Sequence, residues 1–412
     1  MEATSRKVEI EGEIGRISVE KGSTLVPKHQ PKERIYSLGQ QELCLLAGTS
    51  LSYHKGLALL NRLQHRKAET AIKFRTYRDY CERTGRRLEE HLEEETRNTL
   101  NKYHFDVETG TPTSTLDTDL RESAGSYEDN EAIESAVKEI NAARPLEEER
   151  VEVSTWQMER KNQTCYVSFD DICVKHQKEH RTGKDEKNKA YVWNTVVDIQ
   201  AENVSHTVTG TGMRKTFLFT LAYLLKQDLL AGKTLVFFTD GARNISKNID
   251  EMFSFHPYTV ILDWFHLKKR CQEYLSMSVK GKEKRNDILQ KLLRILWAGN
   301  VDAAIAYLHN LGAEVLRPKN RREDLCQYIE KHREHIPPYA LRAKLGLRNS
   351  SNRVEKANDI VVAQRQKHNG MSWSTPGSGA LALISAFIVN DELRSWLNNA
   401  DSSVPFSDAA AA

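Results

Sequence analysis

The sequence lacks an apolar stretch long enough to cross a membrane. Its longest apolar runs, 217–225 and 379–389, fall well short of the ~18–20 residues that a spanning helix needs. Residues 1–30 are interspersed with Glu, Lys and Arg and contain no apolar core of the kind found in a secretory signal. We therefore expect a cytoplasmic protein, with no membrane partner.

Cysteine is sparse and is not arranged for cross-linking. The chain has six cysteines, and no two of them form a Cys-x-x-Cys pair. This spacing argues against a disulfide scaffold and against a zinc site built from cysteines. We interpret the six as small thiols, buried or half-buried, in a reducing cytosol.

Net charge is also small, at +3, but it is the sum of strongly charged segments. Residues 54–88 contain ten Lys or Arg against three Asp or Glu, and 265–348 contain eighteen against nine. Between them, 106–152 has four basic and fourteen acidic residues. The two basic segments favour a polyanionic partner, with nucleic acid the first candidate, and a merely solvated charged surface is the alternative.

The N-terminal part reads as a short β or irregular segment followed by helices. Residues Tyr53, Leu57, Leu60 and Leu63 recur at helical spacing, and a third helix is expected at 68–84, closed by Gly85. Three short helices with a basic last one are typical of a helix-turn-helix unit, and a structural or dimerising bundle is the alternative. The residues expected to bind DNA here are Arg66, Lys67, Lys73, Arg75 and Arg78.

The central part predicts an α/β fold with a mixed sheet. Strands are expected at 164–175, 190–199 and 206–210, then a helix, a strand at 234–239, a second helix and a strand at 259–262. This βββαβαβ order is the element order of an RNase H-like fold, with helices on both faces of the sheet.

The whole chain then divides into seven segments. The acidic segment reads as a linker with one helix at 131–142, and the residues between 280 and 345 read as an all-helical insertion that grips DNA phosphates or forms a structural lid. The predicted boundaries are 1–37 (β or irregular), 38–105 (helical, DNA-binding), 106–160 (acidic linker), 161–279 and 346–398 (the two parts of the catalytic domain), 280–345 (insertion) and 399–412 (disordered tail).

Three carboxylates are spaced as metal-dependent phosphodiester chemistry requires. Asp170 lies inside the first strand, Asp240 directly follows the fourth, and Glu355 lies on a helix expected at 351–368. Neighbouring strands would place the two aspartates side by side. Three acidic oxygen donors suit Mg²⁺ or Mn²⁺, and two such ions ~3.5–4 Å apart can activate a hydroxyl and stabilise the leaving oxygen.

Four sequence blocks carry a resemblance to a known family. They are YVSFDDICVKHQ (166–177), FFTDGARNI (237–245), ILDWFHLKKR (261–270) and NSSNRVEKANDIVVAQRQKHNGMSWS (349–374). The chain resembles bacterial insertion-sequence transposases of the DDE type, in the ISLre/ISKra-like group. The resemblance is good over 166–397 and looser over 38–88.

The resemblance implies that Asp170, Asp240 and Glu355 form the catalytic, metal-binding triad. Asp171 follows Asp170 where such proteins often have glycine, so either aspartate could be the first ligand. Strand alternation puts the two on opposite faces, and the motif register favours Asp170. The resemblance also places Asp263 and His266 near the active edge of the sheet.

Other residues near these blocks have two readings each. Trp264 and Trp373 are candidates for stacking on an unpaired base, with core packing as the alternative. The basic residues expected to contact phosphates of the cleaved strand or of bound DNA are Arg365, Lys367, His368, Lys268, Lys269 and Arg270.

The sequence therefore predicts a transposase that cleaves DNA at transposon ends and joins the freed 3′ hydroxyl to target DNA. The expected partners are terminal inverted repeats, target DNA and a second copy of the chain, in a bacterial, nucleoid-associated setting. The alternatives are a non-catalytic DNA-binding protein derived from a transposase and a nuclease or RNase on the same fold.

Overall fold

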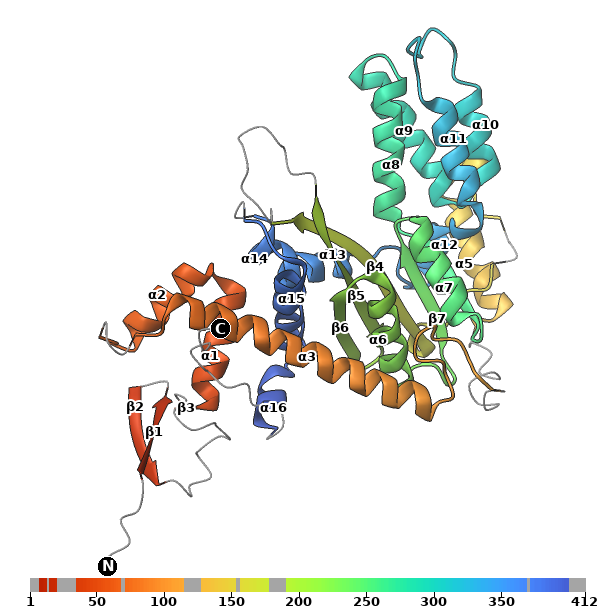
Figure 1. The fold of residues 1–412 in the computed structure, drawn as a ribbon. Coiled ribbons are helices and arrows are strands. Elements are labelled where there is room, and N and C mark those ends of the chain that lie inside the picture. Colours follow the sequence, from red (N-terminus) through yellow and green to blue (C-terminus); the bar gives the residue numbers. More distant parts are fainter. Residues whose placement is uncertain are drawn as a thin grey trace, which may run out of the picture.

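A computed structural model describes residues 7–12, 15–20, 35–67, 71–114, 127–152, 156–177, 190–368 and 371–399. Figure 1 shows a central sheet with helices packed around it, and it places the small N-terminal sheet and a lobe of helices at opposite ends. The predicted tail, apart from residue 399, lies outside the described residues. In the described part, no helix is both long and apolar enough to span a membrane.

The predicted mixed sheet is confirmed. It has five strands in the order β6-β5-β4-β7-β8. The β4–β5 and β5–β6 pairs are antiparallel, whereas β7 runs parallel to β4 and β8 runs parallel to β7. The strands are β4 (Thr164–Lys175), β5 (Tyr191–Ala201), β6 (Val204–Thr211), β7 (Thr234–Thr239) and β8 (Tyr258–Leu262).

Helices cover both faces of the sheet because its strands carry apolar residues on both. Every residue of β7, TLVFFT, is buried, as expected for a parallel strand between two layers. Phe169 of β4 and Phe237 of β7 share a core with helices α6 (Met213–Lys226) and α7 (Arg243–Phe253). On the opposite face, β4 and β5 pack under the C-terminal helices, and β7 and β8 pack under the helical lobe.

The N-terminal part forms a small sheet and three helices. The sheet, β1 (Lys7–Gly12), β2 (Gly15–Glu20) and β3 (Ile35–Tyr36), agrees with the predicted β segment. Ser37 and Ser52 cap the first two helices by accepting a hydrogen bond from a backbone N–H three residues on. The helices are α1 (Leu38–Ser50), α2 (Tyr53–Leu63) and α3 (Phe74–Lys102).

The prediction of a short third helix closed by Gly85 is wrong. Helix α3 spans 29 residues, and Gly85 lies in its middle. A Cβ at this position would lie 2.4 Å from the Cα of Ala380 in α15 (Thr375–Val389), so glycine here permits a close crossing of two helices. The N-terminal helices also share one hydrophobic core with β4, β5 and α15, and residue 105 is not a boundary between separate cores.

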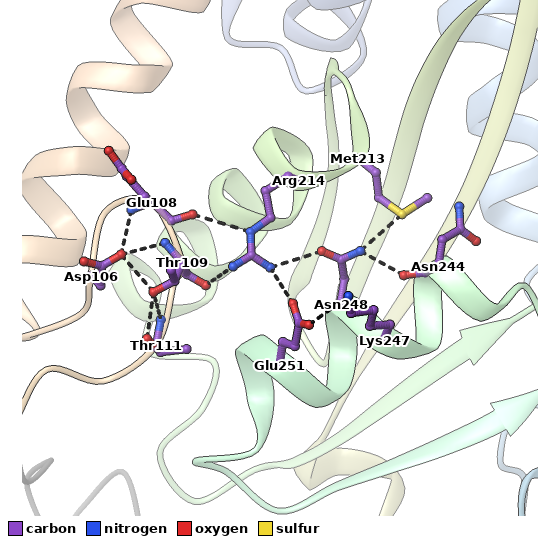
Figure 2. A network of polar contacts seen from close by, with 10 residues as sticks. All are labelled: Asp106, Glu108, Thr109, Thr111, Met213, Arg214, Asn244, Lys247, Asn248 and Glu251. Atoms are coloured by element: carbon purple, nitrogen blue, oxygen red, sulfur yellow. Dashed lines mark hydrogen bonds and ion pairs between the residues drawn. The ribbon is translucent and has the colours of Figure 1, made fainter.

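The acidic segment is more than a linker. Its predicted helix is present as α5 (Asn130–Ala142), and a 3-10 turn, η1 (Glu147–Glu149), follows. The segment begins with an ordered turn in which Asp106 accepts hydrogen bonds from the backbone of Glu108 and Thr109. Figure 2 shows Arg214 of α6 joining this turn to α7 by donating to backbone oxygens of the turn and to Asn248 and Glu251.

The helical insertion begins earlier than predicted. Helix α8 (Trp264–Ser278) packs against the following helices and belongs to the lobe, so the boundary lies near residue 264 and not at 280. Val151 and Met158 of the acidic segment are buried against the base of this lobe. The remaining elements are α9 (Lys282–Trp297), α10 (Val301–His309), α11 (Arg322–Lys331), η3 (Arg333–His335) and α12 (Tyr339–Lys344).

The helix predicted at 351–368 is present but changes its winding partway. It comprises α13 (Asn352–Asn358), a π-helical turn, η4 (Asp359–Ala363), and α14 (Gln364–Gln366). Such π turns often occur at functional sites. Helix α15 follows, with Pro376 in its first turn, and α16 (Leu393–Asn398) ends the described chain.

Candidate active site

Asp170 and Asp240 lie on neighbouring parallel strands. The printed register pairs Ser168 of β4 with Phe238 of β7. Extending that register by two residues places Asp170 beside Asp240, and because side chains alternate along a strand, both point to the same face. The negative charge of Asp240 raises the pKa of Asp170, which is consistent with this closeness.

The structure separates Asp171 from this pair. Asp171 points to the opposite face of β4, where it accepts a hydrogen bond of 2.6 Å from the hydroxyl of Thr195 on β5. The charges that shift the pKa of Asp170 include Asp240, Glu355 and His266, whereas only Asp240 acts on Asp171. The geometry thus favours Asp170 as the group that faces the other two acids.

Glu355 reaches the same face because the segment before α13 is fastened to the start of α8. Asp263, which is 1% exposed, caps α8 by accepting from the backbone N–H of His266 at 3.0 Å. Its second carboxylate oxygen accepts from the backbone N–H of Ser351, and Trp264 donates its backbone N–H to the oxygen of Asn349. Asp263 is therefore buried, and its carboxylate joins the start of α8 to the segment that leads to Glu355.

His266 contacts the third acid directly. Its Nε2 lies 3.4 Å from Oε1 of Glu355, with both side chains partly exposed. The positive form of His266 lowers the pKa of Asp170, so the imidazole lies close to both carboxylates. His266 thus lies beside the carboxylates of Glu355 and Asp170, and its role there stays a prediction.

Asp170 has an unusual electrostatic environment. Burial first, and the charges of Asp240 and Glu355 next, raise its pKa to about 6, against a hydrogen bond from Asn358 that lowers it. The Nδ2 of Asn358 donates to Oδ2 of Asp170 at 2.5 Å, while its buried Oδ1 has no hydrogen-bond partner among the described residues. Sequence analysis missed Asn358, although it stands three residues after Glu355 and hence on the same face of α13.

A second missed residue comes from the helical lobe. A Cβ on Gly241 would lie 2.9 Å from Cε1 of His332, so this ring covers the turn that carries Asp240. Burial lowers the pKa of His332 to about 4, and the nearby Asp240 partly opposes this effect. No local pattern in the sequence relates these two residues, which are far apart along the chain.

The three acids fit a hard divalent cation by their chemistry. They supply carboxylate oxygens only, gathered at a sheet edge where like charges raise the pKa of Asp170. Their ligand atoms are not all within 4.8 Å of one another, since among the described residues only His309, Glu323 and Cys326 meet that spacing.

Arg365 is not placed to contact DNA, and that prediction is wrong. Its side chain is 2% exposed. It donates to the backbone oxygen of Gly48 at 2.8 Å and lies over the rings of Tyr53 and Trp373. The guanidinium thus joins the N-terminal helices to the C-terminal ones, whereas Lys367 and His368 nearby are exposed.

The two tryptophans proposed to stack on bases pack inside the protein instead. Trp373 is 6% exposed and donates its indole N–H to the oxygen of Gln366. Trp264 is half-buried against the rings of Trp297 and Tyr339. Core packing, the alternative considered for both, is the arrangement found.

The basic residues expected to bind DNA have mixed surroundings. Lys67, Lys73, Lys268 and Lys269 are exposed. Arg66 donates to Gln64, and the other arginines of this set lie near acids: Arg75 and Arg78 near Asp79, and Arg270 near Glu273.

Three basic residues of the helical lobe pair with acids of the acidic segment. Lys291 pairs with Glu148, Arg294 with Glu149, and Lys344 with Glu139. These lysines and arginines are thus less available to phosphates than the net charge of the lobe implied. The charge count could not have revealed this, because the partners are separated by more than a hundred residues.

No protein-family model matches the sequence, and no curated protein matches it. Among solved structures, the chain is similar to a chain of the Drosophila P element transposase strand transfer complex. The match covers 59% of this chain and 67% of that chain, at 13% identity and a TM-score of 0.21. A likeness this weak leaves the function to be inferred from the geometry of the site.

Proposed function

We propose that this chain is a DDE-type transposase with an RNase H-like catalytic domain. The observation that carries the proposal is the convergence of Asp170, Asp240 and Glu355, from two adjacent strands and a distant helix, on one face of the sheet. The strand order β6-β5-β4-β7-β8, with its antiparallel and parallel halves, supports the fold assignment, because an RNase H-like sheet has the same arrangement.

The proposed chemistry is hydrolysis of a phosphodiester at a transposon end, followed by attack of the new 3′ hydroxyl on target DNA. Asp170, Asp240 and Glu355 would hold two Mg²⁺ or Mn²⁺ ions, which when bound supply activation of the attacking hydroxyl and stabilisation of the leaving oxygen. Asn358 orients the Asp170 carboxylate through its amide N–H. His266, 3.4 Å from Glu355, holds that carboxylate and offers a proton-bearing group at the site.

The exposed lysines of α8 support a DNA substrate. Lys268 and Lys269 lie within the first two turns of α8, the helix that also carries His266 in its first turn. Their ammonium groups would neutralise phosphates next to the carboxylates, and binding would then weaken as salt rises. The expected partners, which are terminal repeats, target DNA and a second copy of the chain, belong to this proposal.

A cleavage assay tests the proposal. The substrate is a plasmid carrying the gene with its native flanking DNA, and an unrelated plasmid is the control. We expect cuts at the flanks with Mg²⁺ or Mn²⁺, none with a chelator, and none from Asp240→Asn or Glu355→Gln. Asp287→Asn is the matched control, since Asp287 is an exposed acid on α9.

Three results would count against the proposal in different ways. Equal cutting by Asp240→Asn and the wild type would reject the site. Equal cutting of both plasmids, or of RNA, would favour a nuclease on the same fold. Specific binding to the flanks without any cutting would favour a non-catalytic DNA-binding protein.

A further inference from the structure

The helical lobe brings three different metal-binding side chains together at one of its ends. His309 is the last residue of α10, and Glu323 and Cys326 lie in the first two turns of α11. The Nε2 of His309 lies 3.4 Å from Oε2 of Glu323. One ligand atom from each of the three residues lies within 4.8 Å of the other two. The cluster is therefore close in size to the coordination sphere of a single metal ion.

Packed backbone fixes the position of this cluster. Helix α8 leaves the sheet at Trp264 and ends at Ser278, whose oxygen accepts from the backbone N–H of Arg317 in the loop between α10 and α11. The cluster thus lies at the end of the lobe that is away from the sheet (Figure 1). Leu308 and Leu325, each adjacent to a residue of the cluster, are fully buried in the core of the lobe. Two helices held at a fixed separation provide the rigid support that a metal site needs.

The donor atoms of the cluster differ from those of the three acids at the sheet edge. An imidazole nitrogen, a carboxylate oxygen and a thiol sulfur together suit Zn²⁺ and not Mg²⁺. Tetrahedral zinc places its ligand atoms about 3.3–3.7 Å apart, and the distance between His309 and Glu323 already lies in that range. The other separations, at most 4.8 Å, exceed the range by about 1 Å. Rotation of the exposed side chains can close this difference.

An ion pair between His309 and Glu323 accounts for only part of the cluster. Their side chains are 49% and 61% exposed, and ion pairs of this kind are common on protein surfaces. Such a pair has no need of Cys326, which is 3% exposed and stands three residues after Glu323 on the same face of α11. A buried thiol beside an exposed imidazole and an exposed carboxylate forms a three-ligand set with one side open to water.

We propose that His309, Glu323 and Cys326 bind one Zn²⁺ ion, with water as its fourth ligand. The ion joins the end of α10 to the beginning of α11 and so holds the outer end of the lobe together. Because the folded chain presents the three ligands together and the unfolded chain does not, zinc binding should stabilise the fold. The proposal is independent of the proposed DNA cleavage, since no residue of the carboxylate site takes part in it.

Cobalt substitution tests the thiol ligand directly. The full-length protein is treated with a chelator, exchanged into excess Mg²⁺ and titrated with Co²⁺. We expect a cobalt–thiolate absorption band that saturates at about one equivalent and that added Zn²⁺ removes, because thiolate ligands favour Zn²⁺. Co²⁺ bound at the carboxylate site cannot produce this band, since the three acids contain no sulfur.

Single variants test each of the three ligands. Cys326→Ser should abolish the band, whereas Cys173→Ser, which alters a half-buried thiol on β4, is the matched control and should keep it. His309→Ala and Glu323→Ala should each weaken Zn²⁺ binding on the order of 100-fold or more, since losing even a group that only orients a ligand costs about 10–100-fold. His91→Ala, which removes an exposed histidine on α3, should change nothing. Zn²⁺ should raise the Tm of the wild type and leave that of Cys326→Ser unchanged.

Three results would overturn the proposal. They are the absence of the band from the wild type, a band that survives in Cys326→Ser, and unchanged Zn²⁺ affinity in both His309→Ala and Glu323→Ala. Because His309 and Glu323 are exposed, their variants are expected to fold even if Cys326→Ser does not, and melting in a chelator verifies this. None of these measurements uses DNA, so failure of the cleavage assay would leave them unaffected.

Discussion

Two acids near β4 have different surroundings: Glu159, which is buried before the strand, and Asp170, which is half-buried within it. Glu159, just before the strand, receives two hydrogen bonds from the guanidinium of Arg342, and both side chains are 2% exposed. Asp170, within the strand, has only the neutral amide of Asn358 as a hydrogen-bond partner in the described part of the chain. It faces the negative charges of Asp240 and Glu355.

The difference separates an acid that maintains the fold from acids that are available to a ligand. Arg342 also donates to the backbone oxygen of Arg348, so its pair with Glu159 fixes the segment that leads to Glu355. At Asp170 like charges meet, and among the described residues the positive charge that acts on this carboxyl comes from His266 and not from a lysine or arginine. Natural proteins tolerate repulsion between carboxylates at functional sites, where a bound cation relieves that repulsion.

The largest expected effect is on cleavage, when the carboxylate of Asp170 is removed. Asp170→Asn should lower cleavage on the order of 10²–10³-fold or more, because it removes a ligand and a charge acting on the transition state. The same variant should unfold at higher temperature than the wild type in a chelator, since repulsion is removed. Asp171→Asn is the matched control, and a larger activity loss in that variant would transfer the role to Asp171.

The buried pair of Glu159 and Arg342 should respond in the opposite direction, because removing one partner should lower the stability of the fold. Arg342→Met leaves the buried Glu159 without its cation, and we expect a loss of about 3–5 kcal/mol in the free energy of unfolding. The double variant Arg342→Met, Glu159→Leu should recover most of this loss, because an apolar pair can replace a buried ion pair. Chemical denaturation measures all three, and no recovery in the double variant would show that Arg342 acts mainly through its other contacts.

The raised pKa of Asp170 predicts a specific pH dependence of stability. In the unfolded chain the carboxyl has its ordinary pKa of 3.8, and in the folded chain the pKa is about 6. Between these values the folded state binds a proton that the unfolded state does not, so stability falls as pH rises through this window. The expected change is about 2–3 kcal/mol without metal, and Asp170→Asn should lack it when both proteins are titrated in a chelator.

The smallest expected effect concerns the amide that supports Asp170. Asn358→Ala removes the hydrogen bond that lowers the pKa of Asp170, so the carboxyl should hold its proton to a higher pH. We expect the Mg²⁺ concentration that gives half-maximal cleavage to rise by about ten-fold or more, as for other groups that orient metal ligands. Cleavage at increasing Mg²⁺ concentration tests this, and an unchanged profile would show that Asn358 does not orient the ligand.

Local pattern was enough to find the elements that build the site. The apolar, β-branched strands and the helix at 351–368 follow from short-range spacing, and the positions of Asp170, Asp240 and Glu355 within them follow from the same register. The neighbouring arrangement of β4 and β7 then brings the two aspartates together. Asn358 was within reach of the same reasoning, because it shares a helix face with Glu355.

Long-range packing accounts for the predictions that failed. Gly85 looks like a helix stop until Ala380 of another helix is seen against it. Arg365 looks like a phosphate ligand in a basic motif until Tyr53 and Trp373 enclose it. In both cases a decisive neighbour, Ala380 for Gly85 and Tyr53 for Arg365, lies hundreds of residues away along the chain.

The sequence by itself determined which segments form strands and helices and which acids stand at their ends, because period and composition are local properties. Tertiary structure alone decided that Glu159 is neutralised and Asp170 is not, and that Trp193 faces water while Trp373 does not. The physical reason is that burial and charge pairing depend on which distant surfaces meet, and those contacts form only when the whole chain has folded.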